Sequence, residues 1–184
     1  FSFYATKMIA TGEGGMVLTD SRRLAEKLRD LRDYDKKEKH CFRTNSKMTD
    51  LEAAIGIEQM KKLPGFIKRR REIASRYRAA FQGTGVVLPG GDNHRDHVFY
   101  RYVIRIPRRS KEWLKYFESR AIEVKRPVYK PLHEYLGLSG KEFPATHQAM
   151  KEALSLPIYP SLSDEACEEV SAAIREKGLS HVEV

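Results

Sequence analysis

Near its N-terminus the chain reads Ser2-Phe3-Tyr4-Ala5-Thr6-Lys7 and then Thr11-Gly12-Glu13-Gly14-Gly15-Met16-Val17. Glycines in such a position let the backbone turn sharply or approach a ligand closely. A lysine between apolar residues can lose part of its hydration, which lowers the pKa of its amine and makes the amine a nucleophile. The lysine precedes the glycines, so the pattern is not that of a P-loop. A lysine beside a glycine turn is also a common surface residue, because lysine is seldom buried.

The residues that follow combine strand-like and helical patterns. Met16-Val17-Leu18-Thr19 predicts a short buried strand entered through the glycines. Ser21 suits a helix N-cap, and the helix it opens would have one apolar face formed by Leu24, Leu28 and Leu31. The polar stretch of residues 33–46 has no hydrophobic period and is predicted to be a loop.

A second helical region begins at Thr49-Asp50-Leu51-Glu52, which has the form of a capping box. We expect this helix to end near Leu63. Pro64 suits the first turn of another helix, because its fixed φ is helical and its missing N–H is not needed there. The apolar stripe of that next helix consists of Phe66, Ile67, Ile73, Ala74, Tyr77 and Phe81.

The pattern changes after residues 83–91, where we place a domain boundary. In residues 98–106, a fully apolar or aromatic set of side chains alternates with a set that includes Arg101 and Arg105. This period of two predicts a strand with one face more exposed to water than the other. Shorter strands are expected at Val86-Val87-Leu88 and Ile122-Glu123-Val124. Helices are expected around Trp113, Leu114 and Phe117, and from a cap at Ser163 to Gly178. The chain would therefore divide into residues 1–83 and residues 84–184.

Composition narrows the function classes. The 184 residues are 41% hydrophobic and 32% charged, a globular composition, and no stretch approaches the length of a membrane span. The net charge is +9, which suits a nucleic-acid surface or attraction of phosphorylated molecules. A solvated helix face is the preferred explanation for Lys68-Arg69-Arg70-Arg71, because Glu72 follows and apolar residues recur through the run. No helix-turn-helix, zinc-finger or base-stacking motif supports a nucleic-acid module.

The two cysteines and the first residues bear on compartment and completeness. Cys41 and Cys167 lie far apart and form no CxxC pair, which argues against a disulfide framework and a structural metal site and makes a cytoplasmic location the default. The chain begins at Phe1 without a methionine and without a signal-peptide pattern. We therefore expect it to be a piece of a longer polypeptide.

The N-terminal motifs resemble the cofactor-lysine segment of the nucleotide-sugar aminotransferases of the DegT/StrS group. The resemblance implies that Lys7 holds pyridoxal 5'-phosphate in a Schiff base, and that Ser2 binds the cofactor phosphate. A second motif, Asn45-Ser46-Lys47-Met48-Thr49-Asp50, implies that Asn45 reaches across a dimer interface to the phosphate of the partner's cofactor. The chain departs from the family at Arg43, where a glycine is usual, and at Lys47, where an arginine is usual. Arginine and lysine are not equivalent on a phosphate, so Lys47 is only a possible contact.

The C-terminal half continues the resemblance through Pro127-Val128-Tyr129-Lys130-Pro131-Leu132-His133 and Ser155-Leu156-Pro157-Ile158-Tyr159-Pro160. Several relatives carry a His-Tyr pair that faces the sugar, and here Val128 replaces the histidine while Tyr129 remains. Tyr129 and His133 are therefore candidate substrate contacts. A packing or surface position is the alternative for His133.

The resemblance implies an α/β fold, namely the C-terminal part of an aspartate-aminotransferase-like, fold type I enzyme. Residues 1–83 would be the end of the large domain with linking helices, and residues 84–184 a small α+β domain. The implied activity is transfer of an amino group, usually from glutamate, to a keto-sugar on a nucleotide in polysaccharide biosynthesis, by a homodimer with shared active sites. Other cofactor residues lie upstream of Phe1 in the family, so this piece alone should be inactive. The alternative is a non-catalytic member with a regulatory or binding role.

Overall fold

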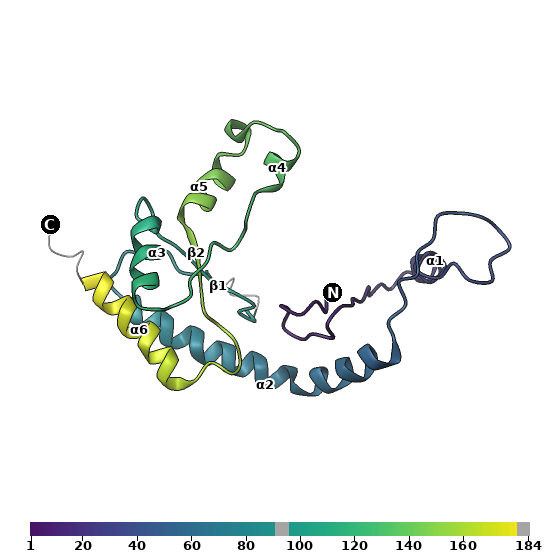
Figure 1. Cartoon of the computed structure of the whole chain (residues 1–184), viewed down its shortest axis with the longest axis horizontal. Coiled ribbons are helices and arrows are strands. Elements are labelled where there is room, and N and C mark those ends of the chain that lie inside the picture. The colour runs from purple at the N-terminus through teal and green to yellow at the C-terminus, as the bar shows by residue number, and fades with distance from the viewer. Residues whose placement is uncertain (91–95, 180–184) are drawn as a thin grey trace. The chain divides into compact units, whose positions relative to one another are not determined.

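The structure is a computed structural model of the chain, and it describes residues 1–90 and 96–179 (Figure 1). The chain forms two compact units, Phe1–Pro64 and Gly65–Val184. The division falls inside helix α2 (Asp50–Ala80), because the buried residues of this helix begin only at Arg70. It therefore lies upstream of the domain boundary expected near residues 83–91, which stays a prediction.

The first unit contains the predicted helix α1 (Arg22–Leu31) followed by a long loop. The N-cap prediction is confirmed, because the Ser21 hydroxyl accepts a hydrogen bond from the Leu24 N–H at 3.3 Å. The strand predicted at residues 16–19 does not form, and its side chains are exposed. A strand needs a neighbour for its backbone groups along its whole length. Of these four residues, only Met16 has a backbone partner among the described residues, through its hydrogen bonds with Phe1.

Helix α2 begins as the sequence predicts and continues where it was expected to stop. The capping box is confirmed: the Glu52 N–H donates to the Thr49 hydroxyl at 3.3 Å, and the Thr49 N–H donates to the Glu52 carboxylate at 2.9 Å. The predicted break at Pro64 is wrong, because the proline lies inside one continuous helix. A proline removes one helical hydrogen bond at a cost of about 3 kcal/mol. The cap at one end and the buried face from Arg70 onward at the other offset this cost.

The second unit is built on two antiparallel strands, β1 (Tyr102–Arg105) and β2 (Ala153–Leu156), with Ile104 opposite Leu154. Only the middle of the predicted strand over residues 98–106 forms, because Phe99 has a φ of +49° that interrupts extended backbone. The strand predicted at residues 122–124 is replaced by a single bridge between Lys125 and Ser155. Residues 86–88 likewise contribute one bridge rather than a strand, Val87 to Arg105.

The core of this unit lies between the strands, helix α3 (Ser110–Ser119), helix α6 (Asp164–Leu179) and the C-terminal half of α2. The Ser163 hydroxyl caps α6 by accepting from the Ala166 N–H at 3.1 Å, as predicted. Between the strands the chain makes an excursion that carries α4 (Leu132–Tyr135), the 3-10 turn η1 (Gly140–Glu142) and α5 (Pro144–Glu152) (Figure 1). The largest fully buried side chains are those of Trp113, Tyr77, Tyr102, Phe117, Ile73, Ile104, Leu154 and Ile174.

None of the helices in residues 1–90 and 96–179 is long and apolar enough to cross a membrane.

Candidate functional site

Ser2 and Lys7 lie on one loop that backbone hydrogen bonds close. The Phe3 N–H donates to the Gly14 carbonyl at 2.9 Å, and the Met16 N–H donates to the Phe1 carbonyl at 3.0 Å. Ser2 lies in this stem, bridged to Gly15. Lys7 lies in the turn beyond it, where its N–H donates to the Tyr4 carbonyl at 2.9 Å and its side chain is partly buried. The two residues singled out from the sequence are therefore held on one ordered segment.

The glycines of this loop are required by its geometry. Gly14 has a φ of +139°, and a Cβ atom there would lie 2.8 Å from the Thr11 hydroxyl and 2.9 Å from the terminal methyl of Met48. A side chain there would have to displace the Thr11 hydroxyl and the Met48 methyl, and it would also be strained by the positive φ, which favours glycine. The Thr11 methyl in turn lies 3.2 Å from the Cβ position of Gly56 on α2. The loop is thereby packed closely against the segment that follows Asn45 and against the first turns of α2.

Asn45 lies in a stretch that returns to the end of α1. The Thr44 N–H donates to the Leu31 carbonyl and the Ser46 N–H to the Arg32 carbonyl, both at 2.9 Å. The hydroxyls of Thr44 and Ser46 are 2.7 Å apart, so these two side chains lie on the same side of the chain. The Asn45 side chain is exposed. Its amide group can both donate to and accept from a ligand.

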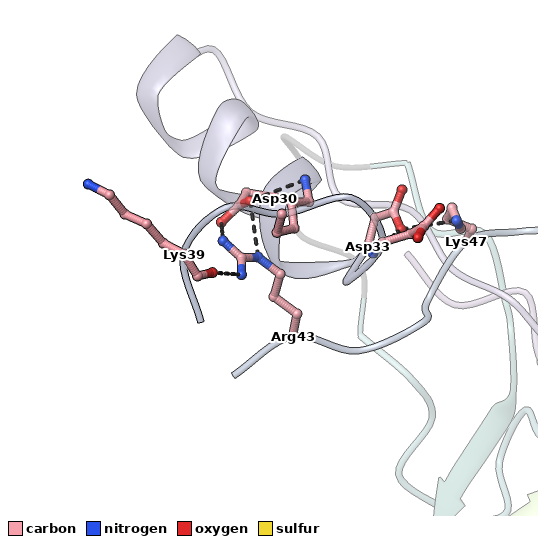
Figure 2. Close-up of polar contacts among 7 residues, drawn as sticks. Asp30, Asp33, Lys39, Arg43 and Lys47 are labelled. Carbon is pink, nitrogen blue, oxygen red and sulfur yellow. Dashed lines mark hydrogen bonds and ion pairs between the residues drawn. The ribbon is translucent and has the colours of Figure 1, made fainter. Parts of the chain in front are cut away.

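The two departures from the family pattern, Arg43 and Lys47, have defined partners (Figure 2). Arg43 donates from Nε and Nη2 to the two carboxylate oxygens of Asp30 at 3.1 and 3.0 Å, and from Nη1 to the Lys39 carbonyl at 2.7 Å. The Lys47 ammonium lies 3.0 Å from a carboxylate oxygen of Asp33. Asp30 and Asp33 were missed from the sequence because each lies far along the chain from its partner.

These ion pairs shift the protonation equilibria of their carboxyl groups. The Arg43 guanidinium holds the pKa of Asp30 below its usual range, with a further contribution from Lys37. The Lys47 ammonium, helped by the Asp35 N–H, lowers the pKa of Asp33. A lowered carboxyl pKa means that the stabilisation is present above about pH 4 and is lost only as the pH falls through the folded-state value. Both pairs are therefore intact at neutral pH.

The candidate substrate residues Tyr129 and His133 lie in the second unit, on the segment that leads into α4. Tyr129 is 95% exposed, so its ring and hydroxyl are available to a ligand. His133 is 6% exposed and stacks on Phe143 with ring centroids 4.7 Å apart. Its Nε2 has no hydrogen-bond partner among the described residues. The His133 ring therefore packs against Phe143 in this chain.

The sequence did not predict a cavity of about 510 Å³ in the second unit, beside residues 121–127. Three cations, Arg101, Lys125 and Arg126, line one part of it. Two of them are directed to backbone carbonyls, since Arg101 donates to Pro127 and Arg126 to Met150. The sequence gives no sign that these cations lie together, because Arg101, just before β1, and the segment before α4 meet only in the folded unit. In residues 1–90 and 96–179, no cluster of three or more His, Cys, Asp or Glu side chains is arranged to hold a metal ion.

Comparison with known proteins places these features in a family. Residues 1–175 match the DegT/DnrJ/EryC1/StrS aminotransferase family. The chain is 34% identical to the spore coat polysaccharide biosynthesis protein SpsC of Bacillus subtilis, over 96% of this chain and 52% of SpsC. It is also 34% identical to the dTDP-3-amino-3,4,6-trideoxy-alpha-D-glucose transaminase of Micromonospora megalomicea, over 96% of this chain and 51% of that protein.

A solved structure supports the same assignment. The crystal structure of DesV from S. venezuelae superposes with a TM-score of 0.89 at 30% identity, covering 97% of this chain and 50% of DesV. The chain thus spans about half the length of the relatives it matches. It belongs to the DegT/DnrJ/EryC1/StrS aminotransferase family.

Proposed function

We propose that the protein containing this chain is an aminotransferase that uses pyridoxal 5'-phosphate to transfer an amino group, usually from glutamate, to a nucleotide-linked keto-sugar. The observation that carries the proposal is the placement of Lys7 and Ser2 on one hydrogen-bonded glycine loop, in a chain that matches the family over residues 1–175. A relative named as a dTDP-sugar transaminase supports the substrate class. We further propose that the chain is the end of the large domain and the small domain of a fold type I enzyme.

The residues of the first unit fit the chemistry of this cofactor. Its phosphate needs hydrogen-bond donors. Among the described residues, Ser2 accepts one long bond, from the Tyr4 N–H at 3.4 Å, and its hydroxyl hydrogen can be donated to an anion. Asn45 presents an exposed amide. Lys7 supplies the amine, and Gly14 lets the loop that carries it pack closely against Thr11 and Met48. Ser2 would hold the phosphate within one subunit and Asn45 would reach it from a second copy.

The proposed roles follow from these positions. When bound, the cofactor supplies an electron-withdrawing ring that eases removal of a proton from the amino donor. Lys7 Nζ would take that proton from the donor carbon as general base and would then deliver it to the cofactor as general acid. The exposed ring and hydroxyl of Tyr129 would contact the sugar nucleotide. His133, four residues further along the same segment, is proposed as a second substrate residue.

The experiment that tests this function is borohydride reduction of the longest form of the protein in the presence of pyridoxal phosphate, followed by peptide mass mapping. We expect a pyridoxyl label on Lys7 that is lost in Lys7→Ala. The matched control is Lys27→Ala, which removes an exposed lysine of α1 in the same unit and should keep the label. Absence of the label in a chain that includes the preceding half of the family's length would overturn the proposal and leave a regulatory or binding role.

Sharing of active sites between two copies is tested separately by subunit mixing. Lys7→Ala and Asn45→Ala proteins would each be impaired when pure. In a mixed dimer, one site would combine the intact Lys7 of one copy with the intact Asn45 of the other. We expect mixing after reversible dissociation to raise activity above that of either parent. No gain, in a preparation where mixed dimers are demonstrated, would place Asn45 in the same subunit as its cofactor.

A further inference from the structure

The long loop after α1 is closed by charged residues at its two ends. Asp30 lies in the last turn of the helix and Asp33 just beyond it, while Arg43 and Lys47 lie on the returning segment (Figure 2). Acidic side chains at a helix C-terminus oppose the helix dipole. Their presence there is understandable only if the cations that face them compensate. The loop residues between them have no regular secondary structure that could hold them in place.

The Arg43–Asp30 pair is the more buried and more rigid of the two closures. The Arg43 side chain is 10% exposed and that of Asp30 34% exposed. The contact is bidentate, which fixes both groups in one plane and gives stronger, shorter bonds than a single neutral pair. Asp30 also faces Lys37 at 3.2 Å. Through its third contact, to the Lys39 carbonyl, Arg43 connects α1 with the outer part of the loop at the same time.

Asn45 lies between the two ion pairs along the chain. In extended backbone, alternate side chains point to opposite sides. Thr44 and Ser46 share one side, as their hydroxyl contact shows. The other side is therefore that of Arg43, Asn45 and Lys47. The two cations are engaged by Asp30 and Asp33, so the exposed amide of Asn45 is the group of the three that is left to meet a ligand.

We propose that Arg43 and Asp30 are positioning residues, whose ion pair holds the Asn45 amide in the place from which it binds the cofactor phosphate of a partner copy. This inference rests on the proposed function. The physical gain is pre-organisation, because a loop that is ordered before binding does not lose its conformational freedom when the ligand arrives. The Lys47–Asp33 pair serves the same end and leaves phosphate binding to an amide rather than to a cation.

The test measures pyridoxal phosphate affinity in the full-length enzyme, by titrating the reconstituted protein and following cofactor absorbance. Arg43→Gly and Asp30→Asn should each raise the Kd about five- to tenfold, the loss expected when one or two side chains must be ordered on binding. The rate at saturating cofactor should stay near that of the unmodified enzyme. Arg43→Lys, which keeps the charge but loses the fork, should fall between. Glu26→Gln, which breaks the exposed Arg22–Glu26 pair on the same helix, should leave the Kd unchanged.

The distinguishing readout is a double-mutant cycle with Asn45→Ala. If Arg43 acts through Asn45, the loss of affinity caused by Asn45→Ala shrinks when Arg43 is already glycine. Additive losses would overturn the positioning role. An unchanged Kd for pyridoxal phosphate in both Arg43→Gly and Asp30→Asn would also overturn it. If Arg43→Gly fails to fold, the nearly isosteric Asp30→Asn provides the same cycle. Failure of the proposed function is separable, because it would appear as a missing Lys7 label in the unmodified enzyme.

Discussion

The two units of the chain are stabilised in different ways. In Phe1–Pro64, all of whose residues are described, only Ile9 and Thr11 are less than a tenth exposed. In Gly65–Val184, an apolar core joins strands and helices from distant parts of the sequence. The first unit is held by backbone hydrogen bonds, two helix caps and ion pairs, all of them local or between loop ends. The proposed cofactor residues are all in this first unit, which has almost no core of its own.

The difference indicates where each unit obtains its stability. Large apolar side chains of the first unit remain in solvent in this chain, and contiguous exposed apolar surface marks sites of association. We therefore expect these exposed side chains of the first unit to be covered by a further polypeptide surface, such as a second copy. The most exposed of its large apolar side chains are those of Phe1, Val17, Leu18, Phe42 and Leu51.

The largest expected effect on this contrast comes from truncating the core of the second unit. Trp113 is 1% exposed and packs against Phe81 and Phe117. Trp113→Ala should lower the free energy of unfolding by about 3–5 kcal/mol, because it removes buried apolar surface and leaves a cavity. Denaturant unfolding of the 184-residue chain, followed by far-UV circular dichroism, measures this change.

The matching truncation in the first unit is Ile9→Ala. It should change the same free energy by at most about 1 kcal/mol, because a site without a surrounding core collapses after truncation. Comparable losses in the two variants would contradict the contrast and would mean that the first unit has a core of its own in solution.

The next effect concerns a buried cation of the second unit. Arg70 is 6% exposed and donates from Nη1 to the carbonyls of Phe99, Tyr100 and Ile158 at 3.1, 3.1 and 2.7 Å. Arg70→Met should cost about 2–3 kcal/mol, because buried carbonyls lose their donor. Thermal unfolding measures the loss. The neighbouring Arg71→Met is the control, since Arg71 is exposed, donates to the His97 carbonyl and forms only an exposed ion pair with Asp96 at 3.7 Å. Equal effects would assign the loss to removal of positive charge rather than to the buried contacts.

The last expected effect depends on pH. Burial raises the pKa of Tyr102 to about 12, although Arg78 acts in the opposite direction. The folded chain then binds this proton more tightly than the unfolded chain. Its contribution is therefore fully present below about pH 10 and is lost as the pH rises through 12, to the extent of about 2 kcal/mol at pH 12.

Tyr102→Phe should be close to the unmodified chain at pH 7, because the Tyr102 hydroxyl has no hydrogen-bond partner among the described residues. It should also unfold less readily than the unmodified chain at pH 11–12, as denaturant midpoints at several pH values would show. An alkaline transition that is unchanged in this variant would assign it to another group, such as Tyr77, whose pKa is also raised by burial.

Much of the local structure could be predicted from the sequence because its causes are local. The Ser21 and Ser163 caps, the capping box at Thr49 and the apolar faces of α3 and α6 depend on residues three or four places apart. The glycine requirement at Gly14 was likewise visible as a pattern before its contacts were known. The candidate site residues were found through the resemblance, since a single lysine near a glycine turn does not distinguish a cofactor site from a surface position.

Tertiary structure decided the features that depend on partners distant in sequence. The strand expected at residues 16–19 has a backbone partner only at Met16 among the described residues, and β1 pairs with Ala153–Leu156, which was not predicted to be a strand. Pro64 does not end its helix, because packing of the following turns outweighs the lost hydrogen bond. The Asp30–Arg43 pair likewise brings together groups on either side of a loop. Capping and turn preferences are set by neighbouring residues, whereas strand pairing, burial and ion pairing require the chain to return to itself, which no short window of sequence records.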